Sequence, residues 1–88
     1  MKHVNEYKKQ YLDLYNKSFN EAYDYYSEVI DEKIQDAIEN LETFIKITKV
    51  KNSAERGAIQ NICNNSELIV TFQKEDDGYS YAIINGWD

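Results

Sequence analysis

Apolar residues in the first half of the chain recur at the three- and four-residue spacing of an α-helix. One repeat runs through Val4, Tyr7, Tyr11, Leu14 and Tyr15; a second runs through Tyr23, Tyr26, Ile30, Ile34, Ala37, Ile38, Leu41, Phe44 and Ile45. The two apolar faces are offset by roughly 100° on a helical wheel, and one helix from 4 to 48 would be about 65 Å long. The pattern therefore predicts two helices, at about 4–16 and 19–48, with a break near Asn16–Ser18 and Ser27 as a second candidate position for it.

The second of these helices has signals at both ends. Ser18 and Glu21 have the spacing of a capping box, and three lysines between 46 and 51 would favour the negative end of the helix dipole. Residues 43–50 are ambiguous, because they are rich in side chains that favour strands. We expect helix to about Thr48, and the alternative is a possible extra strand at 43–50.

A short third helix is predicted at about 53–64. Asn52 or Ser53 can cap its first turn. Its apolar face consists of Ala54, Ala58, Ile59, Ile62 and Cys63. Gly57 costs about 1 kcal/mol relative to alanine inside a helix, which is compatible with a close helix contact. The asparagines at 64 and 65 suit the end of the helix, where a left-handed backbone is common.

The last quarter of the chain has the pattern of a β-hairpin, with strands at about 67–74 and 79–85 around Asp77-Gly78. A two-residue turn there would pair Phe72 with Ile83. In that register one face carries Leu68, Val70, Phe72, Tyr81, Ile83 and Trp87. A lone hairpin is marginal in water, so this face is expected to pack on the helices.

These elements predict an α+β fold in a single domain, 1–88, with three helices followed by a C-terminal antiparallel hairpin. The 88 residues suffice for one modest core. A hydrophobic content of 42% with 14% aromatic residues argues against disorder, although 30% of the residues are charged.

Charge is concentrated in one stretch. Residues 20–42 contain eight of the sixteen acidic residues and one base, Lys33, so their net charge is −7 while the whole chain has −6. The eight acids share an arc of roughly 140° on the wheel, opposite the apolar face, and Tyr25 falls inside that arc. The candidate partner-binding residues are Glu21, Asp24, Tyr25, Glu28, Asp31, Glu32, Asp36, Glu39 and Glu42.

This row is unusual, because exposed helix faces normally mix charges and avoid like-charge repulsion. The simplest interpretation is a solvated face that keeps the protein soluble. The lysines of the first helix could also lie beside the row and neutralise part of it. The alternative interpretation is a binding face.

Residues for catalysis or metal binding are few. His3 lies near a terminus, Cys63 falls on an inward helix face, and Asp76-Asp77-Gly78 has turn chemistry without the ligand spacing of a calcium loop. We therefore expect no enzyme activity, no cofactor and no metal. One cysteine, no signal-peptide pattern and no apolar run of membrane-spanning length lead us to expect a cytoplasmic protein without a membrane partner.

Three binding hypotheses follow. The first is an inhibitor or decoy that presents the acidic face to a basic protein surface, such as that of a nucleic-acid-binding protein, without binding nucleic acid itself. In size, acidity and lack of catalytic residues the chain is similar to phage- or plasmid-encoded inhibitors as a class, such as anti-CRISPR, anti-restriction and bacteriocin-immunity proteins.

The second hypothesis is a winged-helix nucleic-acid-binding domain, because three helices and a hairpin have that order. In it, residues 53–64 would be the recognition helix, but they carry only Arg56 as a base, and the wing tip at 76–78 is acidic. The third hypothesis is a structural module that forms a homodimer through the tyrosine-rich first helix or the hairpin edge.

Overall fold

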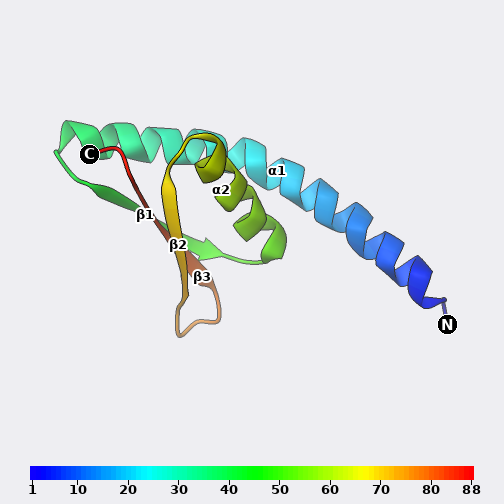
Figure 1. Ribbon diagram of the computed structural model, residues 1–88. Helices are drawn as coiled ribbons and strands as arrows, with labels where there is room; N and C mark the ends of the chain where they lie inside the picture. Colours follow the sequence, from blue (N-terminus) through cyan, green and yellow to red (C-terminus); the bar gives the residue numbers. More distant parts are fainter.

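The computed structural model describes residues 1–88. Its elements are α1 (Val4–Glu39), β1 (Phe44–Val50), α2 (Ser53–Asn65), β2 (Ile69–Lys74) and β3 (Ser80–Asn85) (Figure 1). The strands form one antiparallel sheet in the order β1-β3-β2, and both helices pack on its buried face. The expected α+β class is confirmed, but the details differ, because there are two helices and three strands in place of three helices and a hairpin. The three-helix order on which the winged-helix hypothesis rested is therefore not found.

The predicted break near Asn16–Ser18 is wrong, because α1 is one continuous helix of 36 residues. Ser18 is half-buried within it and caps nothing, and the Ser27 hydroxyl donates to the carbonyl of Tyr23 (2.7 Å) without interrupting the helix. The cap lies at the N-terminus instead, where the His3 Nδ1 accepts a hydrogen bond from the Asn5 N–H (3.1 Å).

A slanted row of rings explains why the apolar face appeared to shift. Four rings spaced four residues apart have centroid separations of 6.1, 6.2 and 6.1 Å along the helix, and we call them the aromatic ridge: Tyr11, Tyr15, Phe19 and Tyr23. Four residues turn about 40° more than one full helical turn, so such a ridge winds gradually around the axis. The change of face is therefore continuous along one helix.

The second helix was predicted to reach Thr48, but α1 ends at Glu39 in a Schellman motif. The Glu42 N–H donates to the carbonyl of Ala37 (2.8 Å), and the Leu41 N–H donates to that of Ile38 (3.1 Å). Leu41 takes the left-handed conformation (φ 57°) that glycine usually supplies, so the sequence has no glycine to mark this end. The motif turns the chain into β1.

Residues Phe44–Val50 therefore form β1, as in the alternative interpretation of this segment. Ile45, Ile47 and Val50 are buried on the helix side of the sheet. A β-bulge between Ile47 and Val50, with Lys49 at φ 57°, shifts the register with β3. The lysines predicted to follow a helix end lie on or just after this strand instead.

The hairpin elements are confirmed, but the predicted register is wrong by one residue. Phe72 pairs with Ala82, because the strands are joined by a longer loop at 75–79, in which the Glu75 N–H donates to the carbonyl of Tyr79 (2.8 Å). A one-residue slip moves every side chain of a strand to its other face. Ala82 and Ile84 therefore point into the core, while Tyr81 and Ile83 lie on the opposite face of the sheet.

The third predicted helix is confirmed as α2, with Asn52 as its N-cap: the side chain accepts from the Glu55 N–H (2.9 Å). Gly57 lies in a close contact with α1, because a Cβ there would lie 2.7 Å from the Tyr15 hydroxyl. The left-handed residue after α2 is Glu67 (φ 58°), not an asparagine as expected.

The core lies between α2, the C-terminal half of α1 and the sheet. Its largest fully buried side chains are Ile59, Ile84, Val50 and Cys63. The N-terminal part of α1 extends beyond this core, which gives the protein an elongated shape of 56 × 28 × 17 Å (Figure 1).

Candidate functional site

The acidic residues singled out in the sequence lie on the outer face of α1. We call seven of them the acidic row: Glu21, Asp24, Glu28, Asp31, Glu32, Asp36 and Glu39. All seven are exposed, and the buried residues Ala22, Tyr26 and Ile30 face the core from the opposite side of the helix. None of the seven carboxylates forms an ion pair. The row is therefore not used to hold the fold together.

Two of the predicted site residues have different surroundings from the rest. Glu42 follows the end of α1 and is separated from the row by the Schellman turn; its carbonyl accepts a hydrogen bond from the Trp87 indole N–H (3.1 Å). Tyr25 lies within the row with 63% of its surface exposed, and its ring packs edge-on against Tyr26 at a centroid distance of 5.0 Å. Tyr25 thus offers an aromatic surface among carboxylates.

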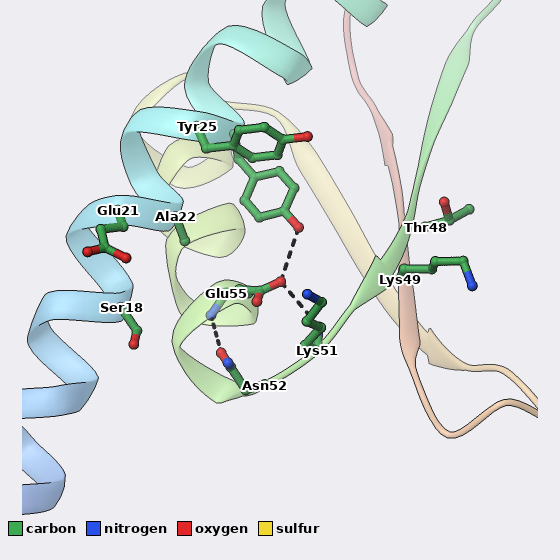
Figure 2. Close-up of a pocket in the computed structure, with 10 residues that line it drawn as sticks. Ser18, Glu21, Ala22, Tyr25, Thr48, Lys49, Lys51, Asn52 and Glu55 are labelled. Atoms are coloured by element: carbon green, nitrogen blue, oxygen red, sulfur yellow. Dashed lines mark hydrogen bonds between the residues drawn. The ribbon is translucent and has the colours of Figure 1, made fainter.

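A groove of about 480 Å³ opens beside the N-terminal end of the row, between α1, the end of β1 and the start of α2 (Figure 2). Glu21 and Tyr25 line it from α1. Lys49 and Lys51 line it from the end of β1, with the Lys49 ammonium turned toward Asp77, and Glu55 lines it from α2. The groove therefore combines both charges with one exposed ring.

Glu55 is the polar centre of this groove. The Tyr26 hydroxyl donates to Glu55 Oε1 (3.2 Å), and the Lys51 backbone N–H donates to the same oxygen (3.3 Å) (Figure 2). Burial, reinforced by the neighbouring Glu55 carboxylate, raises the pKa of Tyr26 to about 12. The phenol therefore keeps its proton, and keeps donating to the carboxylate, at a pH where an ordinary tyrosine would already have ionised.

A second groove, of about 520 Å³, follows the other flank of the row, between α1 and the end of α2. Glu28 and Asp31 stand at its rim. Its hydrophobic residues are Tyr23, Ile30, Ile34, Ile62 and Leu68. A carboxylate rim over an apolar floor suits the side chains of lysine and arginine, which carry a charge at the end of an apolar stem.

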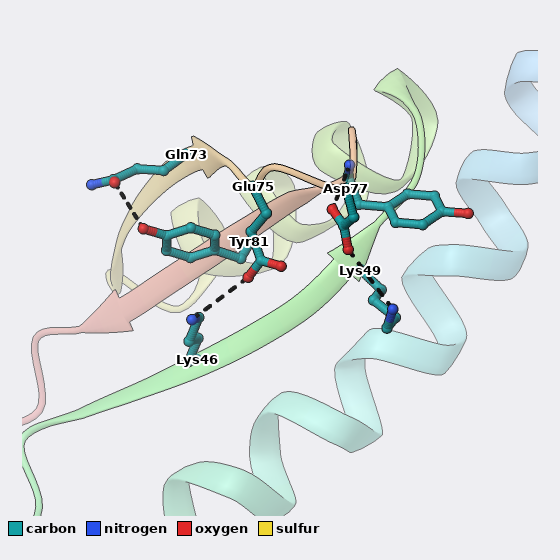
Figure 3. Close-up of polar contacts among 7 residues, drawn as sticks. Lys46, Lys49, Gln73, Glu75, Asp77 and Tyr81 are labelled. Atoms are coloured by element: carbon teal, nitrogen blue, oxygen red, sulfur yellow. Dashed lines mark hydrogen bonds and ion pairs between the residues drawn. The ribbon is translucent and has the colours of Figure 1, made fainter.

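The lysines of the sheet do not neutralise the row. Lys46 pairs with Glu75 (3.6 Å) and lies 4.2 Å from the centroid of the Tyr81 ring (Figure 3). Lys49 pairs with Asp77 (3.8 Å). Of the lysines of the first predicted helix, Lys17 lies one helical turn before Glu21 but forms no ion pair with it, and the others lie farther back along the same chain and cannot fold onto the row.

The residues considered for catalysis or metal binding lie where they serve the structure of the protein. Cys63 is fully buried, as expected, and burial raises the pKa of its thiol to about 11. The Asp77 side chain accepts from the Tyr79 N–H (2.9 Å), which is turn chemistry. No group of three histidine, cysteine or acidic residues is placed to hold a metal ion, and neither helix is long and apolar enough to cross a membrane.

Sequence reasoning missed the two grooves, because their walls come from segments far apart in the chain. Glu55 was noted only as an acid in the first turn of a helix, yet it joins α1 to α2. Leu68 was placed on a hairpin face and instead borders Glu28 and Asp31. No local sequence signal could have identified these contacts.

Comparison of the chain with models of protein families, with curated proteins and with solved structures found no match.

Proposed function

We propose that this protein is a non-enzymatic binding protein that docks the acidic row of α1 on a basic surface of another protein. The observation that carries the proposal is that seven exposed carboxylates share one helix face and none forms an ion pair within the chain. Like charges one helical turn apart repel, so the row costs stability. A basic partner would relieve that cost on binding.

The grooves that flank the row would make binding selective in a way that charge alone does not. An arginine or lysine entering beside Glu21 would meet the exposed ring of Tyr25, and cations bind aromatic faces favourably. On the other flank, Glu28 and Asp31 can accept the charged end of a side chain whose stem covers Ile34 and Leu68. Both features favour a protein surface over a free cation.

The spacing of the row suits a partner that handles nucleic acids. Carboxylates three or four residues apart rise by about 5 Å along a helix, a separation of the same order as that of backbone phosphates. A basic groove built for phosphates would therefore accept the row. We propose that the protein acts in the cytoplasm as an inhibitor or decoy of such a partner and binds no nucleic acid itself.

The test compares two triple charge reversals. Glu28→Lys, Asp31→Lys and Asp36→Lys reverse the row, whereas Glu6→Lys, Asp13→Lys and Asp76→Lys change the net charge equally at exposed sites outside it. The wild-type protein and both variants are used to capture partners from a bacterial lysate at about 50 mM and about 500 mM salt.

The proposal requires a nucleic-acid-binding protein that the wild type and the control variant capture at low salt, and that the reversed row loses. Affinity measured with the purified partner should fall by at least ~100-fold for the reversed row. Equal capture by all three proteins would refute the acidic row as the binding face. Binding of duplex DNA by the wild type at low salt would refute the decoy proposal directly.

A further inference from the structure

The N-terminal part of α1 presents an apolar surface that no other part of the chain covers. We call its members the apolar stripe: Val4, Tyr7, Tyr11, Leu12 and Leu14, each at least 45% exposed. The start of α2 reaches only to Tyr11, where the hydroxyl groups of Tyr11 and Ser53 are 3.4 Å apart. Five exposed large apolar side chains on a projecting helix are unusual for a monomer.

Most charged residues of the same segment point away from the stripe. On the helix, Glu6, Lys9 and Asp13 project from the opposite side, whereas Lys8 lies within the stripe, between Val4 and Leu12. A surface with five large apolar side chains and one lysine, whose stem is itself apolar, suits an apolar partner rather than water alone.

Two depressions give the stripe its shape. One, of about 460 Å³, is lined by Val4, Tyr7, Lys8, Tyr11 and Leu12. The other, of about 170 Å³, lies between α1 and the start of α2, and its lining includes Tyr11, Tyr15 and Ser18. Both include Tyr11, so they lie on either side of its ring and follow one another along the helix.

We propose that a second copy of this chain covers the stripe, with the two α1 helices antiparallel and Tyr11 of one copy facing Tyr11 of the other. In this register Tyr7 of one copy lies opposite Tyr15 of the other, and Val4 lies opposite Ser18. The helix start of each copy therefore enters the depression between α1 and α2 of the other copy. This proposal stands independently of the function proposed for the acidic row.

The area available is sufficient for a dimer. Five side chains exposing on the order of 100 Å² each supply at most about 500 Å² per copy, or about 1,000 Å² in total, which is about the minimum for a biological interface and fits a weak dimer. A parallel arrangement would place the two Lys8 side chains side by side. The antiparallel arrangement separates them along the axis.

Charge complementarity also favours the antiparallel arrangement. The helix of the second copy would begin opposite Ser18, so its positive dipole end and its Lys2 would approach Glu21, the first residue of the acidic row. The two rows lie at opposite ends of the dimer. They are then separated by more than a Debye length at physiological salt, which is about 8 Å.

The first experiment measures molar mass by light scattering between about 1 µM and 1 mM protein. The wild type should pass from 10.4 kDa to twice that mass as concentration rises. Tyr11→Asp should weaken the dimer at least ~100-fold, because it buries two carboxylates at the centre of the interface. Tyr25→Asp is the matched control on the same helix, since Tyr11 is 61% and Tyr25 63% exposed, and it should dimerise as the wild type does.

Helical circular dichroism establishes that both variants remain folded. A wild type that stays monomeric throughout the range overturns the proposal. So does an equal effect of the two substitutions.

The second experiment tests the register. Val4→Cys and Ser18→Cys proteins are mixed and treated with a short bifunctional maleimide; Cys63 does not compete because it is fully buried. The antiparallel register predicts links between positions 4 and 18, identified by peptide mass spectrometry, and few between two copies of position 4. Dominant links between the two copies of position 4 would indicate a parallel pair and would overturn the proposed arrangement.

Discussion

Reversing one charge in the acidic row should make the protein more stable. Glu28 has three acidic neighbours one helical turn away: Asp24, Asp31 and Glu32. Each like-charge pair costs about 0.2–0.5 kcal/mol, and an opposite pair gains about as much. Glu28→Lys converts three repulsions into attractions, so the free energy of unfolding should rise by about 1–3 kcal/mol at low salt. For a domain of this size, each kcal/mol corresponds to a rise in Tm of about 4–8 °C.

The assay is thermal unfolding followed by circular dichroism at low and high salt. Glu28→Gln removes repulsion without adding attraction and should give about half of the gain. Glu6→Lys is the matched control, since it changes the net charge equally on the same helix but has Lys2 and Lys9 as neighbours, and it should not stabilise. If Glu28→Lys is no more stable than the wild type at low salt, or if its gain persists at high salt, the carboxylates do not repel one another and the row carries no cost.

Three further predictions concern the fold. Leu41→Gly should stabilise the protein by about 1 kcal/mol, because the Leu41 backbone has a left-handed conformation and its side chain is 90% exposed. Leu12→Gly, within α1, should destabilise the protein by about as much in the same denaturant titration. Gly57→Ala should leave the free energy of unfolding nearly unchanged, because the added Cβ would lie 2.7 Å from the Tyr15 hydroxyl and this clash offsets the better helix propensity of alanine. In a Tyr15→Phe background the same substitution should stabilise the protein by about 1 kcal/mol. Equal effects in both backgrounds would contradict that contact. The free energy of unfolding should decline above pH 9. Folding raises the pKa of Cys63 from 9.0 to about 11 and that of Tyr26 from 10.0 to about 12, so the unfolded chain releases these protons at lower pH than the folded protein does. Tyr26→Phe should make this decline less steep between pH 10 and 12, as measured by urea titrations.

Local patterns were enough to predict the parts of the fold that depend on local physics. The helical period, a cap of α2 at Asn52 or Ser53 and the two hairpin strands could all be predicted, because each depends on a short stretch of sequence. The outward direction of the acidic row also followed from the helical period alone.

Long-range contacts decided the parts that were predicted wrongly. Residues 44–50 have both helical and strand character, and pairing with β3 selects the strand. The turn that ends α1 has Leu41 in the left-handed conformation, a position where glycine or asparagine is usual and leucine is rare. The hairpin register depends on a loop that spans 75–79 rather than on Asp77-Gly78 alone.

The continuity of α1 links the two proposed interfaces. A flexible break near Ser18 would have let the tyrosine-rich segment fold back on the core, which would bury the apolar stripe and bring its lysines to the acidic row. A single helix prevents both, so the stripe and the row stay exposed at fixed positions on one rod. In the antiparallel dimer, the centres of the two rows near residue 30 would lie about 57 Å apart at 1.5 Å per residue from Tyr11. Two rows held at that distance can engage two basic sites of an oligomeric partner together, and binding at the second site then gains from the high effective concentration set by the rigid connection.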